Sequence, residues 1–96
     1  MRILGNGVFN KSLQRFTQDK GAFNAWYSEV SFAAWKNYHE VKARYPSLSP
    51  LGNNYYYFNI KGNTYRIEVI IRFQSQLVVI EWIGTHAEYD KRNKKR

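Results

Sequence analysis

Hydrophobic and polar positions follow two different periods in the two halves of the chain. Before residue 47, apolar side chains recur every three or four positions, which is typical of amphipathic helices. From residue 55 onward, apolar and polar side chains alternate, which is typical of strands buried on one face. The change of period predicts an α+β fold in which two to three N-terminal helices pack on an antiparallel sheet of about three to four strands.

The helical half begins with a short segment that can form a strand, and Gly5 then interrupts the chain. We expect a short strand at Arg2–Leu4 and a first helix that starts near Asn10, with Val8, Leu13 and Phe16 on one side. A second helix is expected over Ala22–Trp35 and a third over Tyr38–Tyr45. Pro46 ends the third helix because a residue before proline disfavours helical geometry. We expect Ser47–Asn54, which contains proline, glycine and asparagine, to be a loop.

The second helix carries a stripe of large side chains at helical spacing. The residues of this stripe are Phe23, Trp26, Tyr27, Val30 and Ala34. We interpret the aromatic side chains Trp26, Tyr27, Phe32 and Trp35 as core residues rather than as a surface on which bases stack.

Three strands are predicted in the second half, at Tyr55–Ile60, Thr64–Phe73 and Leu77–Thr85. The first two are joined at Gly62-Asn63, two residues that both tolerate the positive φ of a tight turn. Such a turn places Lys61 opposite Thr64, Asn59 opposite Arg66 and Tyr57 opposite Glu68, all on one face. The other face is apolar and predicts a core of Tyr56, Phe58, Ile60, Tyr65, Ile67, Val69 and Ile71.

The third strand extends both faces if its turn has an even number of residues. In that register Val78, Ile80 and Trp82 join the core face, and Val79, Glu81 and Ile83 join the polar one. The polar face is then partly open to solvent, and we expect function there.

Composition narrows the classes of function. The 96 residues fit one small domain, 1–96, and the absence of cysteine excludes disulfides, thiolate metal ligands and cysteine nucleophiles. Two histidines without metal-ligand spacing argue against a zinc site, and no glycine-rich phosphate-binding motif is present. The longest apolar run is Leu77–Ile80, and no signal segment is evident, so we expect a cytoplasmic protein without a membrane partner.

Charge favours a polyanionic partner. The chain has 15 Lys and Arg against 7 Asp and Glu, a formal net charge of +8. Basic residues are concentrated in a tail at about 91–96, where Lys91, Arg92, Lys94 and Lys95 can hold phosphates without reading sequence. The alternative is a solvated tail that only aids solubility.

The polar face carries the groups that RNA cleavage requires. RNA supplies its own 2′-hydroxyl nucleophile, so a protein needs only to move two protons and to stabilise charge on the phosphorane. The candidates are Arg66, Lys61, His86 and Tyr89 for catalysis, with Asn59 and Glu68 for RNA binding.

Each candidate also has a purely structural interpretation. Arg66 and Glu68 can be an ordinary pair on an exposed sheet face. His86 can be a capping residue where the strand passes into a helical turn, and Tyr89 can simply pack at the sheet edge. We interpret Glu81 as a solvated side chain.

Several segments, in order over residues 22–91, resemble the HigB toxins of bacterial toxin–antitoxin modules. These are Ala25-Trp26-Tyr27, Trp35, Val41–Ser47, Gly52-Asn53-Asn54, Phe58–Asn63 with Tyr65-Arg66, and Gly84–Asp90. The resemblance implies a RelE-like fold and a cofactor-free, metal-independent endoribonuclease that cuts mRNA on the translating ribosome. It also implies a HigA-type antitoxin partner with a helix-turn-helix DNA-binding fold.

Other functions remain compatible with the residues. The chain can be a non-catalytic module that binds RNA or the ribosome, a ribonuclease that works without ribosomes, or an inactive relative that only binds a protein partner.

Overall fold

The computed structural model describes the backbone of residues 1–94 and the side chains of residues 1–92. Its strands are β1 (Arg2–Leu4), β2 (Ser49–Gly52), β3 (Tyr55–Ile60), β4 (Tyr65–Arg72) and β5 (Leu77–Thr85). Its helices are α1 (Asn6–Arg15), α2 (Lys20–Phe32), α3 (Tyr38–Arg44) and α4 (His86–Lys94), with a 3₁₀ turn, η1, at Thr17–Asp19. The α+β class predicted from the sequence is confirmed.

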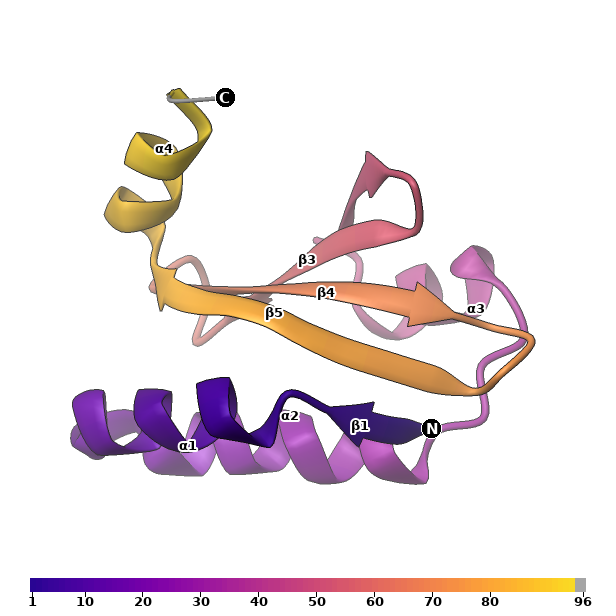
Figure 1. Ribbon diagram of the computed structural model, residues 1–96, viewed down its shortest axis with the longest axis horizontal. Coiled ribbons are helices and arrows are strands. Elements are labelled where there is room, and N and C mark those ends of the chain that lie inside the picture. Colours follow the sequence, from indigo (N-terminus) through magenta and orange to yellow (C-terminus); the bar gives the residue numbers. More distant parts are fainter. Residues whose placement is uncertain (95–96) are drawn as a thin grey trace.

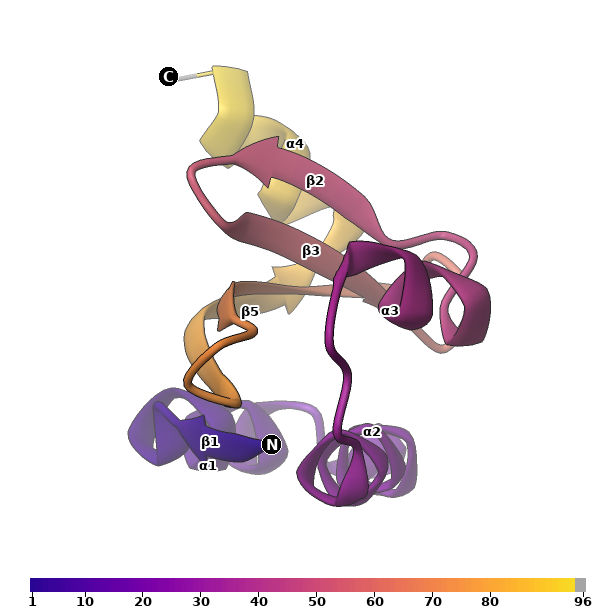
Figure 2. The ribbon, with the colours of Figure 1, turned by 90° about the vertical axis from the view of Figure 1, so that its right-hand side faces the viewer.

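The described strands form one sheet in the order β1-β5-β4-β3-β2. β1 pairs with β5 in parallel, and the other neighbours are antiparallel, so the sheet is mixed and has more strands than predicted. α1 and α2 cover one face, and α4 stands on the opposite side (Figure 1). α3 lies next to β3, where Tyr45 packs edge-on against Phe58 at 5.0 Å (Figure 2).

The hydrophobic core lies between the sheet and the helices α1 to α3. Most of the predicted strand residues are buried in it: Phe58, Ile60, Tyr65, Ile67, Val69, Ile71, Val78 and Ile80. The predicted Tyr56 is only partly buried, and Ile3 of β1 joins the core without having been predicted. From the helices, Phe9, Phe23, Trp26, Val30 and Val41 join the same cluster. The register across β3 and β4 is also as predicted, with Asn59 opposite Arg66 and Tyr57 opposite Glu68.

One predicted segment is wrong, and one helix was not predicted. The segment expected to be a loop, Ser47–Asn54, contains β2, which tolerates Pro50 because an edge strand can lack one amide donor. After Thr85, where a helical turn was only one interpretation of His86, the chain forms α4.

The first two helices have boundaries that the apolar pattern did not give. α1 begins at Asn6 rather than near Asn10, directly after Gly5. Gly5 has a φ of +93°, and a Cβ there would lie 2.5 Å from the Ile80 carbonyl oxygen, so only glycine fits. α2 ends at Phe32 instead of Trp35, which leaves Phe32 87% exposed and outside the predicted aromatic core.

A bulge in β5 overturns part of the predicted face assignment. Val69 pairs with Ile80 but Glu68 pairs with Trp82, so Glu81 is an extra residue in the ladder. One extra residue reverses the alternation of the side chains that follow it. Trp82 therefore lies on the open face and Ile83 packs against the core, the reverse of the prediction.

The turn between β3 and β4 differs from the predicted one in its detail. Positive φ angles occur at Lys61 (53°) and Gly62 (63°) rather than at Gly62 and Asn63. The Thr64 amide donates to the Lys61 carbonyl at 3.2 Å and closes the turn without altering the strand register.

Candidate active site

Arg66 lies at the centre of the polar side chains on the open face. Its Nε donates to Asn59 Oδ1 at 3.2 Å, across the β3–β4 pair. The guanidinium carbon lies 4.4 Å from the centre of the Tyr57 ring and 4.8 Å from that of Tyr89. The side chain is only 14% exposed, so this cation is held in one orientation by two aromatic rings and an amide.

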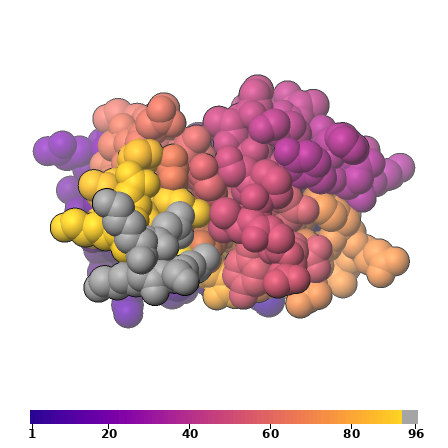
Figure 3. Space-filling view, turned by 90° about the horizontal axis from the view of Figure 1, so that it is seen from above, coloured from indigo at the N-terminus to yellow at the C-terminus, as the bar shows by residue number. Residues whose placement is uncertain are grey.

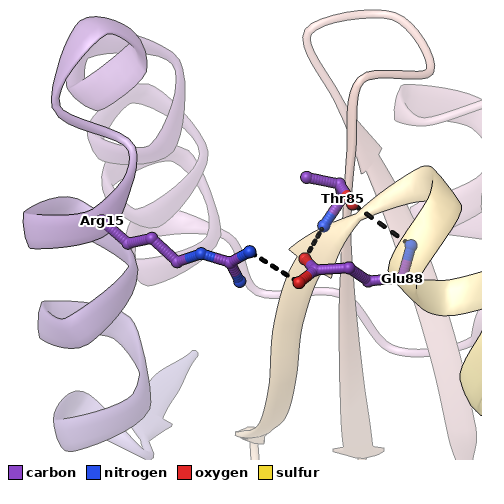
Figure 4. Close-up of polar contacts among 3 residues, drawn as sticks. All are labelled: Arg15, Thr85 and Glu88. Atoms are coloured by element: carbon purple, nitrogen blue, oxygen red, sulfur yellow. Dashed lines mark hydrogen bonds and ion pairs between the residues drawn. The ribbon is translucent and has the colours of Figure 1, made fainter.

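α4 starts with a capping box (Figure 4). The Glu88 amide donates to Thr85 Oγ1 at 3.2 Å, and the Thr85 amide donates to Glu88 Oε1 at 2.9 Å. These two bonds satisfy donors that a helix start leaves unpaired. The Thr-x-x-Glu pattern was present in the sequence as a signal for this helix, but the preceding strand pattern obscured it.

Arg15 fastens the capping box to α1. Its Nη2 donates to Glu88 Oε2 at 2.6 Å, which ties the first turn of α4 to the end of α1 (Figure 4). The Arg15 hydrogen bond and the Thr85 bonds outweigh desolvation and lower the pKa of the Glu88 carboxyl. The contact therefore fixes where α4 leaves the sheet.

The capped helix places His86 beside Arg66. His86 Nδ1 lies 3.3 Å from Asp90 Oδ2, one helical turn on, and Arg66 Nη1 lies 4.0 Å from Asp90 Oδ1. The His86 side chain is 42% exposed and so accessible to a ligand. Asp90 links both candidates, and sequence analysis did not nominate it, although the His-x-x-x-Asp spacing puts the two on one helical face.

Tyr89 lies under this group as a buried ring. It is 1% exposed, and its ring centre is 4.9 Å from that of Tyr57 and 5.7 Å from that of Trp82. Its hydroxyl has no hydrogen-bond partner among the described residues. The structure thus brings Tyr89 to Arg66 through the ring, with the hydroxyl shielded from solvent.

Glu68 and Arg92 form a second pair on the same face. Arg92 Nη1 donates to Glu68 Oε1 at 2.7 Å, and the Arg92 guanidinium lies 5.2 Å from the Trp82 ring centre. Glu68 is 1% exposed, so its carboxylate is buried against Arg92 instead of facing solvent as an exposed strand residue would. A buried carboxylate needs such a partner. This pair attaches α4 to β4.

Lys61 is turned toward the helices rather than toward Arg66. Its ammonium lies 2.5 Å from Asp19 Oδ1, and the same carboxylate accepts a hydrogen bond from the Tyr65 hydroxyl. These two bonds lower the pKa of Asp19, and the Asp19 bond raises that of Tyr65. The β3–β4 turn is thereby attached to η1, and its Thr64 carbonyl in turn accepts from the His86 amide at 3.1 Å.

The remaining basic candidates belong to the end of the chain. Lys91 is exposed on α4. The side chain of Lys94 and the whole of Lys95 lie outside the described residues. In the part of the chain with described side chains, no three His, Asp or Glu residues gather into a possible metal site. None of the helices described is long and apolar enough to span a membrane.

Comparison with known proteins gives consistent matches. Residues 19–92 match the family HigB_toxin, described as the RelE-like toxic component of a toxin–antitoxin system. An mRNA interferase HigB of Escherichia coli O6:H1 is 25% identical over 93 residues, 95% of this chain and 90% of that protein. An mRNA interferase toxin HigB of Escherichia coli K12 and an mRNA interferase HigB of Shigella flexneri are each 27% identical over 92 residues, 94% of this chain and 88% of each relative.

Proposed function

The chain belongs to the HigB toxin family, the RelE-like toxic component of a toxin–antitoxin system, and from this premise we propose that it is an endoribonuclease that cuts mRNA as the ribosome translates it. The observation that carries the proposal is the grouping of Arg66, His86 and Asp90 on the open sheet face of a member of this family. The relatives reported above are mRNA interferases, and their similarity covers 94–95% of this chain.

The reaction needs no nucleophile from the protein. A base removes the proton of a ribose 2′-hydroxyl, and the 2′-oxygen forms a bond to the adjacent phosphorus. The bond from phosphorus to the 5′-oxygen breaks, and an acid protonates that oxygen. The products are a 2′,3′-cyclic phosphate and a 5′-hydroxyl, and we propose that no metal takes part.

Arg66 is the group best suited to the phosphate. Its planar guanidinium offers several parallel N–H donors to phosphate oxygens, and charge on these oxygens grows in the transition state. The rings of Tyr57 and Tyr89 and the amide of Asn59 preorganise it. Asn59 also has amide donors with which to orient a base or a ribose.

His86 is the group best suited to the proton transfers. It is half-exposed beside Arg66, and Asp90 holds its Nδ1, which leaves Nε2 for the substrate. Tyr89, with its hydroxyl shielded, serves by its ring as a positioning residue for Arg66. Lys61 and the Glu68–Arg92 pair position the turn and α4, and Lys61, Lys91, Arg92, Lys94 and Lys95 add positive charge for RNA.

The family implies an antitoxin as partner, and we propose one of HigA type with a helix-turn-helix DNA-binding fold. Action on translated mRNA places the toxin at the ribosome, in the cytoplasm. We propose that residues 1–96 act as a single domain, since α1 to α3 share one core cluster with β1, β3, β4 and β5, and α4 is attached to β4 by the Arg92–Glu68 bond.

Expression in a bacterial host tests the proposal. Growth should stop on induction and resume when the antitoxin gene is co-expressed, and the cut mRNA should carry 2′,3′-cyclic phosphate and 5′-hydroxyl ends. Growth that continues in the presence of folded protein would contradict the proposal.

A further inference from the structure

A cleft beside the Arg66 group is unused by the mechanism. It has a volume of about 360 Å³ and is lined by residues of the β2–β3 segment, by Glu68 of β4 and Glu81 of β5, and by Arg92 of α4. Seen from above, α4 (yellow) and the β2–β3 segment (rose) occupy different sides of the open face (Figure 3). Residues lining it include Gly52, Asn53, Tyr55, Glu68, Glu81 and Arg92.

The bulge in β5 gives the cleft an unusual carboxylate. Because Glu81 is the extra residue of the ladder, it lines this cleft. Its neighbour Trp82 packs against Tyr89 on the same face. Glu81 is exposed, and none of the described side chains forms an ion pair or hydrogen bond with it. Its two oxygens are therefore available as acceptors in a protein that otherwise presents an excess of positive charge.

Arg92 and Tyr55 complement this carboxylate. Arg92 uses one Nη to hold the buried Glu68 at 2.7 Å, is 30% exposed, and keeps other N–H donors. Tyr55 lines the cleft and brings an aromatic side chain on which a base can stack. The cleft thus offers an acceptor pair, a donor and an aromatic surface.

We propose that this cleft binds a guanine base of the RNA, next to the position of the cut. Guanine carries two adjacent donors, N1–H and the N2 amino group, which match the two Glu81 oxygens. Its O6 accepts from Arg92, as arginine commonly contacts guanine. Adenine and cytosine present only one amino donor on this edge, and uracil presents only its ring N–H. The proposal rests on the proposed function in placing the base beside a scissile phosphate.

The spacing along β4 supports this placement. Glu68, on the floor of the cleft, is two residues from Arg66 and on the same face, roughly 7 Å along the strand. Neighbouring nucleotides of an extended RNA strand are separated by a distance of this order. A phosphate on Arg66 therefore leaves an adjacent base within reach of the cleft.

Two substitutions at Glu81 test the inference against a charge-matched control. Glu81→Gln keeps the shape but replaces one acceptor by a donor, which suits adenine better than guanine. Glu81→Ala removes both acceptors. Glu40→Gln makes the same change in net charge on α3, at an exposed residue remote from the open face.

Mapping of 5′ ends on a library of translated mRNAs gives the readout. The unsubstituted protein and Glu40→Gln should favour guanine at one position beside the cut, by roughly tenfold. Glu81→Gln should shift that preference toward adenine, and Glu81→Ala should lose it, while both variants still cut. The same guanine preference in both Glu81 variants, or none in the unsubstituted protein, would overturn the inference.

A binding measurement separates this inference from the proposed function. Guanosine 5′-monophosphate should shift the amide NMR signals of Gly52 and Asn53, adenosine 5′-monophosphate should do so less, and Glu81→Ala should abolish the difference. Guanosine-selective shifts without any mRNA cutting would support the cleft and contradict the proposed ribonuclease. Equal shifts with both nucleotides would contradict the cleft whatever the protein cuts.

Discussion

Arg66 combines positive charge with a fixed orientation. A solvated arginine samples many rotamers, whereas this one packs on Tyr57 and Tyr89 and hydrogen-bonds Asn59. The Asp90 carboxylate lies 4.0 Å from Arg66 Nη1 through one oxygen and 3.3 Å from His86 Nδ1 through the other. A phosphate arriving here therefore meets a cation that is already oriented and a histidine whose ring is already placed.

The first prediction concerns Arg66 itself. Arg66→Ala should reduce the rate of mRNA cleavage by about 10²–10³-fold, because a preorganised donor to the developing charge is removed. Arg66→Lys should recover only part of this rate, since an ammonium keeps the charge but not the planar fork. Arg72→Ala, an exposed arginine on the same strand, is the control and should cut normally. A folded Arg66→Ala protein that cuts at full rate would remove Arg66 from the mechanism.

At the scale of elements, the sequence predicted the sheet well where alternation alone decides the structure. The limits of β5, the Asn59–Arg66 register and the buried strand residues all followed from period two and a tight turn. The faces of Trp82 and Ile83 did not, because the bulge at Glu81 has no signature in a regular alternating pattern. β2 was missed because its pairing depends on β3 and its own residues are typical of turns.

The sequence named several residues of the candidate site but not Asp90, and it gave none of the tertiary contacts. Arg66, Asn59 and His86 were identified by residue type and by their place on the strands or after them. The remaining contacts depend on where η1 and α4 pack. These are the contact of Lys61 with Asp19, the burial of Glu68 against Arg92 and the burial of Tyr89. Such tertiary contacts carry no local sequence signal.

The second prediction concerns the β3–β4 turn. If Lys61 acts by attaching the turn to η1, Lys61→Ala and Asp19→Asn should slow cleavage to a similar degree. Both variants should also speed hydrogen exchange of the His86 amide, which donates to the Thr64 carbonyl oxygen. If Lys61 instead contacts the RNA, Asp19→Asn should leave cleavage unchanged. Rates and exchange measured for both variants decide between these roles.

The third prediction concerns the attachment of α4. The pKa of Glu88 is lowered from 4.5 by Arg15 and Thr85, so its ionised form stabilises the folded state. That contribution is complete above pH 4.5 and is lost as pH falls through the lower folded pKa. The difference in unfolding free energy between the unsubstituted protein and Glu88→Gln should therefore shrink below pH 4.5 in urea titrations. Asp19 titrates in both proteins and cancels, and a difference that stays constant with pH would contradict this account.

At the scale of the whole molecule, a net charge of +8 favours a polyanionic partner, and the sheet face that the fold leaves partly open is where we propose that RNA binds. α1 and α2 cover the other face (Figure 1), and Val41 of α3 joins the same core, so the sheet separates the hydrophobic core from the side proposed to bind RNA. α4 belongs to the open side and carries His86 and Asp90. The toxin's stability and its proposed chemistry thus rest on different faces of one sheet.

The fourth prediction concerns the basic end of the chain. Deletion of residues 93–96, which keeps Arg92 on Glu68, removes three basic residues and should weaken RNA binding. The slope of log affinity against log salt should fall by roughly 0.7 for each phosphate that the shortened chain no longer neutralises. The charge control is a triple variant that removes three lysines from the helical half of the chain: Lys11→Gln, Lys20→Gln and Lys36→Gln. The same salt slope before and after the deletion would make the tail only a solubilising segment.

Cleavage on programmed ribosomes tests the central claim most directly. A defined mRNA is incubated with the protein, with and without ribosomes, and the 5′ ends are mapped. The account predicts cuts in the decoding site only when ribosomes are present, and loss of these cuts in Arg66→Ala. No cuts in either arm by folded protein would contradict the ribonuclease, and equal cutting of naked RNA would contradict its dependence on the ribosome.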